Sequence, residues 1–217
     1  MSKNIVIFNK KGGVGKSTLA TNLAVEYSNR IGYTTLVDLD VSQTSLKFMN
    51  RRADSELMQD KLSIVIPNNN EELDIVLEDD TTTRIYDVGG FQDEMAINAL
   101  MGADLLVVPV SDSPQDKDTT MEFIKTLQTI EADGFGVDTI FVMNNTSPQA
   151  KFENLAKRVD YIREAGYDLY GAISHYAIFS VAHGSGMSVC EINEDSKASK
   201  QLLQFITGVK ERLNDNS

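Results

Sequence analysis

The residues that point most directly to chemistry form a glycine-rich run with several lysines. Residues 9–18 read Asn-Lys-Lys-Gly-Gly-Val-Gly-Lys-Ser-Thr and follow the apolar run 5–8. Glycines let backbone N–H groups converge on phosphate oxygens, and a helix that begins at the end of such a run adds a favourable field for an anion. Lys16 would reach the β- and γ-phosphates of a nucleotide, and the Ser17 hydroxyl would bind magnesium. The run therefore predicts a phosphate-binding loop, although Lys10 stands where the usual pattern has its first glycine.

Carboxylates occur where a magnesium-dependent phosphate site needs them. Asp38 and Asp40 come at the end of the β-branched run 34–37, and Asp87 lies in the apolar run 84–88. Parallel strands bring their carboxyl ends to one edge of a sheet, so we expect these side chains to lie beside the phosphate loop. Asp38 and Asp40 would share one strand face, which leaves open which of them serves the metal.

The elements that must position this site alternate along the chain. Short apolar runs predict strands at 5–8, 34–37, 62–66, 84–88, 105–110, 140–143 and 169–173. Helices are predicted after the loop and over 93–101, 114–130, 148–164 and 197–213. Fully apolar strands that alternate with helices are typical of a parallel sheet covered on both faces. We therefore expect an α/β fold over residues 1–217, a single domain with one doubly wound, mostly parallel sheet, and an exposed excursion at the acidic stretch 68–83.

Composition excludes several classes of protein. The 217 residues are 41% hydrophobic and 24% charged, as in a soluble globular chain. The longest apolar runs, such as 105–110, fall far short of the roughly 18 residues of a membrane helix, and the first residues do not resemble a signal peptide. A single cysteine, Cys190, excludes a disulfide within the chain. The net charge of −12 argues against a surface devoted to nucleic acid. From the apolar runs, the first residues and the single cysteine together, we expect a cytoplasmic protein.

The loop resembles a known motif in detail. Residues 11–17, Lys-Gly-Gly-Val-Gly-Lys-Ser, are similar to the deviant Walker A motif of the ParA/MinD family of P-loop ATPases. The resemblance implies that Lys11 crosses a dimer interface to the partner's nucleotide, while Lys16 holds phosphate within its own chain. It makes Ser17 the magnesium ligand. It also implies nucleotide contacts from the rest of the loop, namely Gly12, Gly13, Val14, Gly15 and Thr18.

The resemblance extends to the two aspartate segments and to one asparagine. It implies that Asp40 positions the attacking water and that Asp87 reaches magnesium through water. Asn144, after the run 140–143, stands where the family often has an adenine-reading asparagine. Residues 41–43, Val-Ser-Gln, depart from the family's Pro-Gln and suggest a one-residue insertion. Asp38, Asp40 and Gln43 therefore all remain candidates for positioning the water, and Asp38 also remains a candidate metal ligand.

The function implied by the resemblance is an ATPase that requires ATP and Mg²⁺, forms a homodimer with ATP, and hydrolyses it slowly unless stimulated. Such a cycle drives plasmid or chromosome partition, or positions a cellular cargo, with a small ParB-like or adaptor partner. Non-specific DNA and association with the nucleoid are further expectations. They rest on the resemblance and on basic residues in the C-terminal helices, which are Lys151, Lys157, Arg158, Arg163, Lys197, Lys200, Lys210 and Arg212.

Two alternative functions stay open. One is a metabolic P-loop enzyme such as an ATP-dependent ligase, which would need a second substrate pocket. The other is a nucleotide-gated interaction module with little hydrolysis.

Three remaining features have ordinary structural interpretations. The last helix has apolar residues at helical spacing but a polar end, so we expect it to pack on the protein rather than to bind a membrane. His175 and His183 lack nearby partners for catalysis, and we expect both to be loop residues. Cys190 is expected to be a small buried hydrophobe.

Overall fold

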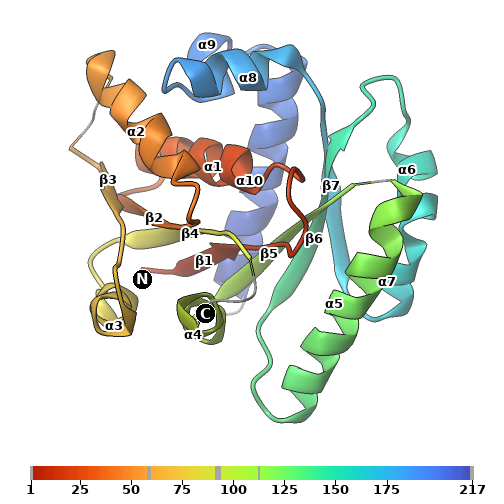
Figure 1. Ribbon diagram of the computed structural model, residues 1–217. Helices are drawn as coiled ribbons and strands as arrows, with labels where there is room; N and C mark the ends of the chain where they lie inside the picture. The colour runs from red at the N-terminus through yellow and green to blue at the C-terminus, as the bar shows by residue number, and fades with distance from the viewer. Residues whose placement is uncertain (1, 58–59, 91–93, 112, 216–217) are drawn as a thin grey trace.

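One parallel sheet organises the molecule (Figure 1). The computed structural model describes residues 2–57, 60–90, 94–111 and 113–215. Within these ranges the strand order is β3-β2-β4-β1-β5-β6-β7, and every neighbouring pair is parallel. The strands are β1 (Asn4–Ile7), β2 (Thr34–Leu39), β3 (Leu62–Val65), β4 (Thr83–Val88), β5 (Leu105–Val110), β6 (Thr139–Thr146) and β7 (Asp168–Ser174). The predicted fold class is confirmed.

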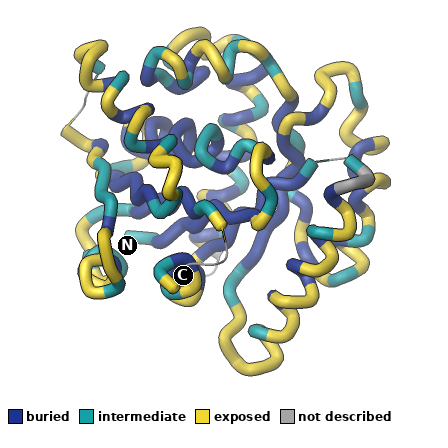
Figure 2. Tube along the Cα trace, viewed as in Figure 1, coloured by how far each residue is buried: buried dark blue, intermediate teal, exposed yellow. Residues whose placement is uncertain are grey.

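Helices cover both faces of the sheet, and the central strands between them, such as β1 and β5, are buried (Figure 2). Side chains alternate along β1, so that Ile5 and Ile7 pack into one hydrophobic core and Val6 into the other. The first face carries α1 (Lys16–Arg30), α2 (Thr44–Asp54), α8 (Ala177–Gly184), α9 (Val189–Ile192) and α10 (Lys197–Asp215). The second carries α3 (Asn70–Glu78), α4 (Glu94–Met101), α5 (Pro114–Ala132), α6 (Phe152–Arg158) and α7 (Asp160–Glu164).

The structure corrects some predicted elements. The acidic stretch 68–83 is not wholly an exposed excursion, because it contains α3. Asn69 begins this helix by accepting a hydrogen bond from the Glu72 N–H (2.9 Å), and Leu73 is buried in the core. The helix predicted over 148–164 begins only at Phe152 and divides into α6 and α7 at Val159.

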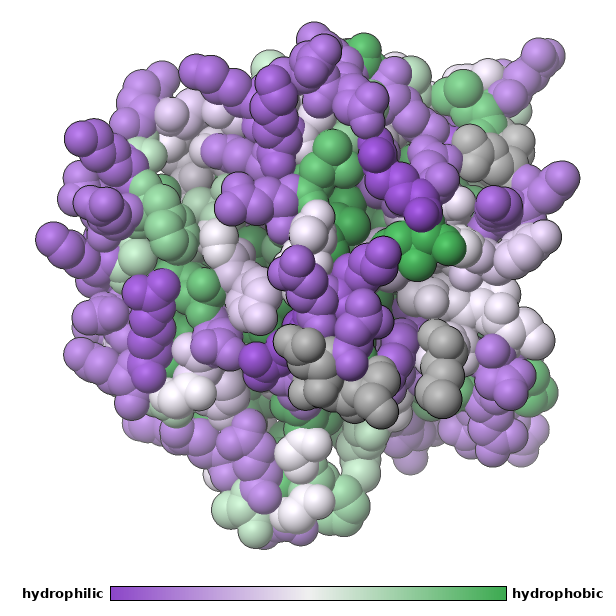
Figure 3. Space-filling model, turned by 180° about the vertical axis from the view of Figure 1, so that it is seen from behind, coloured by the Kyte–Doolittle hydropathy of each residue, from purple (hydrophilic) through white to green (hydrophobic). Residues whose placement is uncertain are grey.

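The last helix packs against the sheet, as predicted. Its apolar side chains enter the first core, and the Arg212 guanidinium pairs with Asp138 (2.7 Å) and Asp168 (2.9 Å) beside β6 and β7. No helix among the described residues is long and apolar enough to cross a membrane. The face shown in Figure 3 is largely hydrophilic, with small hydrophobic patches between polar side chains.

Buried polar contacts fasten α8 and α9 to the helices beside them. The Arg52 guanidinium on α2 is fully buried and donates to both carboxylate oxygens of Glu191 (2.8 and 2.7 Å) and to the Gly186 carbonyl (2.9 Å). The Val189 N–H donates to Asn22 Oδ1 on α1 (3.0 Å). These contacts fix the segment between α8 and α9 on α1 and α2. The nearby Cys190 is buried, as predicted.

Gly186 is the point at which this segment approaches α2 most closely, and it carries our first prediction. Its φ is +67°, and a Cβ there would lie 2.3 Å from the Arg52 nitrogen and 2.5 Å from its Cα. We expect Gly186→Ala to lower the free energy of unfolding by about 3 kcal/mol, from left-handed strain and a backbone clash. Gly184→Ala is the matched control for chemical denaturation, because no atom lies within 4 Å of its added Cβ. Equal, small effects of both variants would contradict this reasoning.

Candidate functional site

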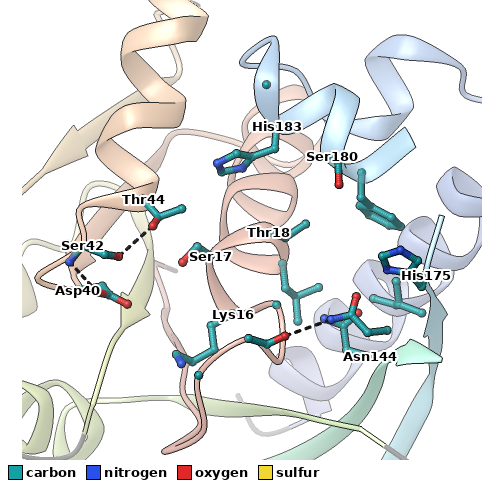
Figure 4. Close-up of a pocket in the computed structure, with 18 of the residues that line it drawn as sticks. Lys16, Ser17, Thr18, Asp40, Ser42, Thr44, Asn144, His175, Ser180 and His183 are labelled. Atoms are coloured by element: carbon teal, nitrogen blue, oxygen red, sulfur yellow. Dashed lines mark hydrogen bonds between the residues drawn. The ribbon is translucent and has the colours of Figure 1, made fainter. Parts of the chain in front are cut away.

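A cavity of about 750 Å³ opens at the carboxyl ends of the strands (Figure 4). The phosphate loop and the start of α1 form its base, and the segment before α2 forms one wall. The ends of β6 and β7 and helix α8 form the opposite wall. The lining residues include Gly12, Gly13, Gly15, Lys16, Ser17, Thr18, Asp40, Ser42, Thr44, Arg51, Asn144, His175, Tyr176, Phe179, Ser180 and His183. Residues predicted from distant parts of the sequence are thus brought together.

The phosphate loop has the backbone expected of an anion cradle. Gly13 and Gly15 adopt left-handed conformations (φ 78° and 87°), and Gly15 immediately precedes α1. The Lys16 side chain is buried and its Nζ donates to the Lys11 carbonyl (3.1 Å). Burial lowers the pKa of the Lys16 amine, and the negative charges of Asp87 and Asp40 oppose this shift. A phosphate in the cavity would add further negative charge beside this buried amine.

Two asparagines hold the loop in place. Asn9 donates to the Pro109 carbonyl (2.7 Å) and accepts from the Lys11 N–H (2.8 Å), which ties the loop to the end of β5. Asn144 Nδ2 donates to the Val14 carbonyl (2.7 Å) from the end of β6. A Cβ on Gly15 would lie 2.3 Å from this same Nδ2, and its φ of 87° also disfavours other residues, so glycine suits this position. In this structure the Asn144 amide therefore supports the loop, and its contact with a base stays a prediction.

Asp87 has the environment of a carboxylate that awaits a cation. It is fully buried, and its Oδ2 accepts a hydrogen bond from the Ser45 hydroxyl (2.7 Å). Its Oδ1 is buried without a hydrogen-bond partner. Burial raises the pKa of Asp87 to about 6, although interactions with the Ser45 and Ser17 hydroxyls oppose the shift. The free Asp87 oxygen fits the outer shell of a magnesium ion, and the nearby Ser17 hydroxyl fits a direct ligand.

The other ligands of such an ion would have to come from the substrate. Among the described residues, no group of three His, Cys, Asp or Glu side chains is arranged to hold a metal. Mg²⁺ commonly combines few protein ligands with nucleotide phosphates and water. The residues present thus fit a magnesium ion that arrives with a nucleotide, held by Ser17 directly and by Asp87 through water.

The structure separates Asp38, Asp40 and Gln43, which the sequence left as alternatives. Asp38 is buried in β2, and its two oxygens accept from the Asp40 N–H (3.0 Å) and the Leu46 N–H (2.8 Å). Burial raises the pKa of the Asp38 carboxyl, while these backbone N–H groups oppose the shift. Gln43 is exposed and precedes α2 with φ 49°. Asp40 lines the cavity, with its Oδ1 accepting from the Ser42 N–H (2.8 Å).

Lys11 takes a different course from Lys16. Its ammonium pairs with Asp116 in the first turn of α5, and the Ser111 hydroxyl also donates to this carboxylate. Asp116 is buried, with 4% of its surface exposed. Sequence reasoning missed Asp116 and Asn9. The available signal was their position, since Asn9 is the second residue after β1 and Asp116 lies six residues after β5.

The two histidines both line the cavity, but one prediction about them was wrong. His175 lies in the turn after β7 as expected, whereas His183 is in α8. The His183 ring lies 5.3 Å from the Phe48 ring, and burial and the charge of Arg51 lower the pKa of His183. The His183 ring therefore lines the cavity beside α2.

Comparison with solved structures supports the fold. Apo McdA from Cyanothece has a TM-score of 0.76 at 16% identity, over 98% of this chain and 100% of that one. A ParA family ATPase from Chlorobium tepidum has a TM-score of 0.69 at 18% identity, over 95% and 98% of the two chains. MinD from Pyrococcus horikoshii, complexed with Mg-ADP, has a TM-score of 0.73 at 14% identity, over 100% and 99%.

The sequence itself matches a family description. No curated protein matches it significantly. The family model of the CobQ/CobB/MinD/ParA nucleotide-binding domain, however, matches residues 5–189, which include the phosphate loop, both aspartate segments and the Asn144 strand. With the parallel sheet and the preformed loop described above, the conclusion is that this chain belongs to the CobQ/CobB/MinD/ParA nucleotide-binding domain family.

Proposed function

We propose that this chain is an ATPase that forms a dimer when it binds ATP and returns to monomers after hydrolysis. The family to which it belongs binds nucleotides, and one structural neighbour carries Mg-ADP. The cavity offers an anion cradle, a buried lysine and a carboxylate with a free oxygen. Together these groups can bind a nucleoside triphosphate with its magnesium ion.

Each residue has a distinct part in the proposed reaction. Lys16 and the loop N–H groups bind the β- and γ-phosphates and stabilise their developing charge. Ser17 would bind the magnesium ion directly, and Asp87 would hold it through water by its free Oδ1. Asp40 reaches the cavity beside the loop and positions the attacking water. When bound, the magnesium ion neutralises phosphate charge.

The observation that carries dimerisation is the placement of Lys11. Lys16 already supplies an in-chain cation to the cavity, whereas Lys11 is not among the residues that line the cavity, and its side chain is 39% exposed. The exposed Gly12 and Gly13 beside it leave the loop's outer surface open. A lysine in this place can meet a nucleotide held by a second copy of the chain, where it would act as an arginine finger does in other ATPases.

Replacing Lys11 tests this proposal. We expect Lys11→Ala to keep ATP binding, because Lys16 and the loop remain, but to lose the ATP-dependent dimer and to slow hydrolysis by about 100-fold. Light scattering and ADP release measure the two effects. Lys10→Ala is the matched control, since Lys10 is the adjacent, exposed lysine. An unchanged dimer and unchanged turnover in Lys11→Ala would remove Lys11 from the proposed mechanism.

The cycle would serve as a timer that positions a cargo or partitions DNA, with a small partner protein that stimulates hydrolysis. Non-specific DNA binding stays a prediction. Fewer of the basic residues are available for DNA than the sequence indicated, because Arg212 forms ion pairs with Asp138 and Asp168. Lys151, Lys157 and Arg163 are exposed. A ligase would instead show ADP release that depends on a second small molecule.

A further inference from the structure

Lys11 is held in its own chain by a buried carboxylate. The Asp116 side chain contacts the Lys11 ammonium and accepts a hydrogen bond from the Ser111 hydroxyl. Asp116 is 4% exposed, whereas Lys11 remains 39% exposed. The carboxylate thus belongs to the protein interior, and the lysine is the member of the pair that solvent reaches.

The topology places these groups together. β5 lies beside β1 in the sheet, so the loop that follows β1 and the turn that follows β5 meet at the same edge. Asn9 reinforces this contact through the Pro109 carbonyl on β5. Asp116, in the first turn of α5, then contacts the Lys11 ammonium, and Ser111, directly after β5, donates to Asp116.

Separating the pair has a definite cost. If Lys11 leaves, the buried Asp116 carboxylate loses its cation and keeps only the Ser111 hydroxyl among its described partners. A buried charge that loses its counter-ion is strongly unfavourable. Any state in which Lys11 reaches elsewhere must overcome this cost.

Nucleotide binding would directly affect the loop segment that carries the ion pair between Lys11 and Asp116. Lys16 Nζ donates to the Lys11 carbonyl, and the Lys11 N–H donates to Asn9. A phosphate that attracts Lys16 would remove the donor from the Lys11 carbonyl. The loop segment that carries Lys11 would lose one of its two backbone restraints at the moment when a nucleotide arrives.

We propose that Asp116 is a latch that holds Lys11 within its own chain and sets the threshold for ATP-dependent dimerisation. This inference rests on the proposed function. In the nucleotide-free chain, Asp116 neutralises Lys11 and keeps its charge from the dimer surface. In the dimer, the partner's nucleotide competes with Asp116 for the same ammonium. Asp116 is therefore a positioning residue that acts through Lys11.

Two substitutions should shift dimerisation in opposite directions. Asp116→Asn keeps the shape and an oxygen for Ser111 but removes the charge, so Lys11 leaves without stranding a buried anion. We expect its dimer to form at about tenfold lower protein concentration than the wild type. Ser111→Ala makes Asp116 more dependent on Lys11, so its dimer should need about threefold higher protein concentration. Sedimentation velocity with a non-hydrolysable ATP analogue measures both midpoints.

The lysine itself supplies the control. In a Lys11→Ala background, Asp116→Asn should no longer promote dimerisation, and circular dichroism should show that each variant is folded. If the wild type dimerises and Asp116→Asn leaves the protein concentration at the dimerisation midpoint unchanged or raises it, the latch is overturned and the proposed function stands. If neither the wild type nor Asp116→Asn dimerises, both proposals fail. If Asp116→Asn forms a dimer and the wild type does not, the latch is supported, because the ATP analogue then fails to separate Lys11 from Asp116 in the wild type.

Discussion

Replacing Asp40 with alanine should slow ATP hydrolysis by about 100-fold or more, because a group that positions or deprotonates the attacking water contributes about that much. ATP binding should persist, since Lys16 and the loop are untouched. The ATP-bound dimer should persist too and accumulate, because its release depends on hydrolysis. Steady-state ADP release and light scattering, read on the same samples, measure the two effects.

The neighbours of Asp40 provide the comparison. Gln43→Ala should hydrolyse ATP at nearly the wild-type rate, because Gln43 is exposed outside the cavity wall. Asp38→Asn should mainly lower stability, because Asp38 accepts two backbone hydrogen bonds that hold the segment before α2. If Asp40→Ala turns over normally while folded Asp38→Asn does not, the water-positioning role belongs to Asp38.

Removing the Lys16 amine should weaken ATP binding by about 100-fold or more. This amine is buried at the base of the cavity, and a charge-assisted contact with phosphate is strong where water is excluded. In the nucleotide-free chain this amine donates a hydrogen bond to the Lys11 carbonyl, and we expect its loss to cost less in stability than in phosphate binding. Lys16→Ala should therefore fold normally and fail mainly in binding.

Calorimetric titration with Mg-ATP measures the Lys16 effect. Lys10→Ala is again the control, because it removes an equal charge from the exposed side of the same loop. A less than threefold change in affinity for Lys16→Ala would contradict the assignment of Lys16 as the in-chain phosphate ligand.

The sequence predicted the fold well where local pattern and burial agree. Strands such as Leu105–Val110 are apolar throughout because both faces of the sheet are covered, and that pattern is visible without a structure. The phosphate loop was predictable for a similar reason, since its chemistry requires adjacent residues. Gly13 and Gly15 have the left-handed backbone that the motif needs.

The missed features depend on contacts between distant residues. α3 is acidic and buries Leu73 against α4, so its stability comes from tertiary packing rather than from a broad apolar stripe. Asp116 acquires its importance from Lys11, which is 105 positions away in the chain. Asn144 resembled a base reader, but its amide also holds the Val14 carbonyl, and that contact depends on how β6 meets the loop.

The ion pair between the buried Arg52 guanidinium and Glu191 ties α2, which lines one side of the cavity, to α9. At one end of α2, Asp38 and Asp87 hold the Leu46 N–H and the Ser45 hydroxyl. At the other end, Arg52 donates hydrogen bonds to Glu191 of α9. The wall that carries Asp40 and the wall formed by α8 are therefore braced against each other before any ligand enters. Folding has already ordered these walls, so nucleotide binding has less conformational entropy to overcome and more of its contact energy remains for affinity.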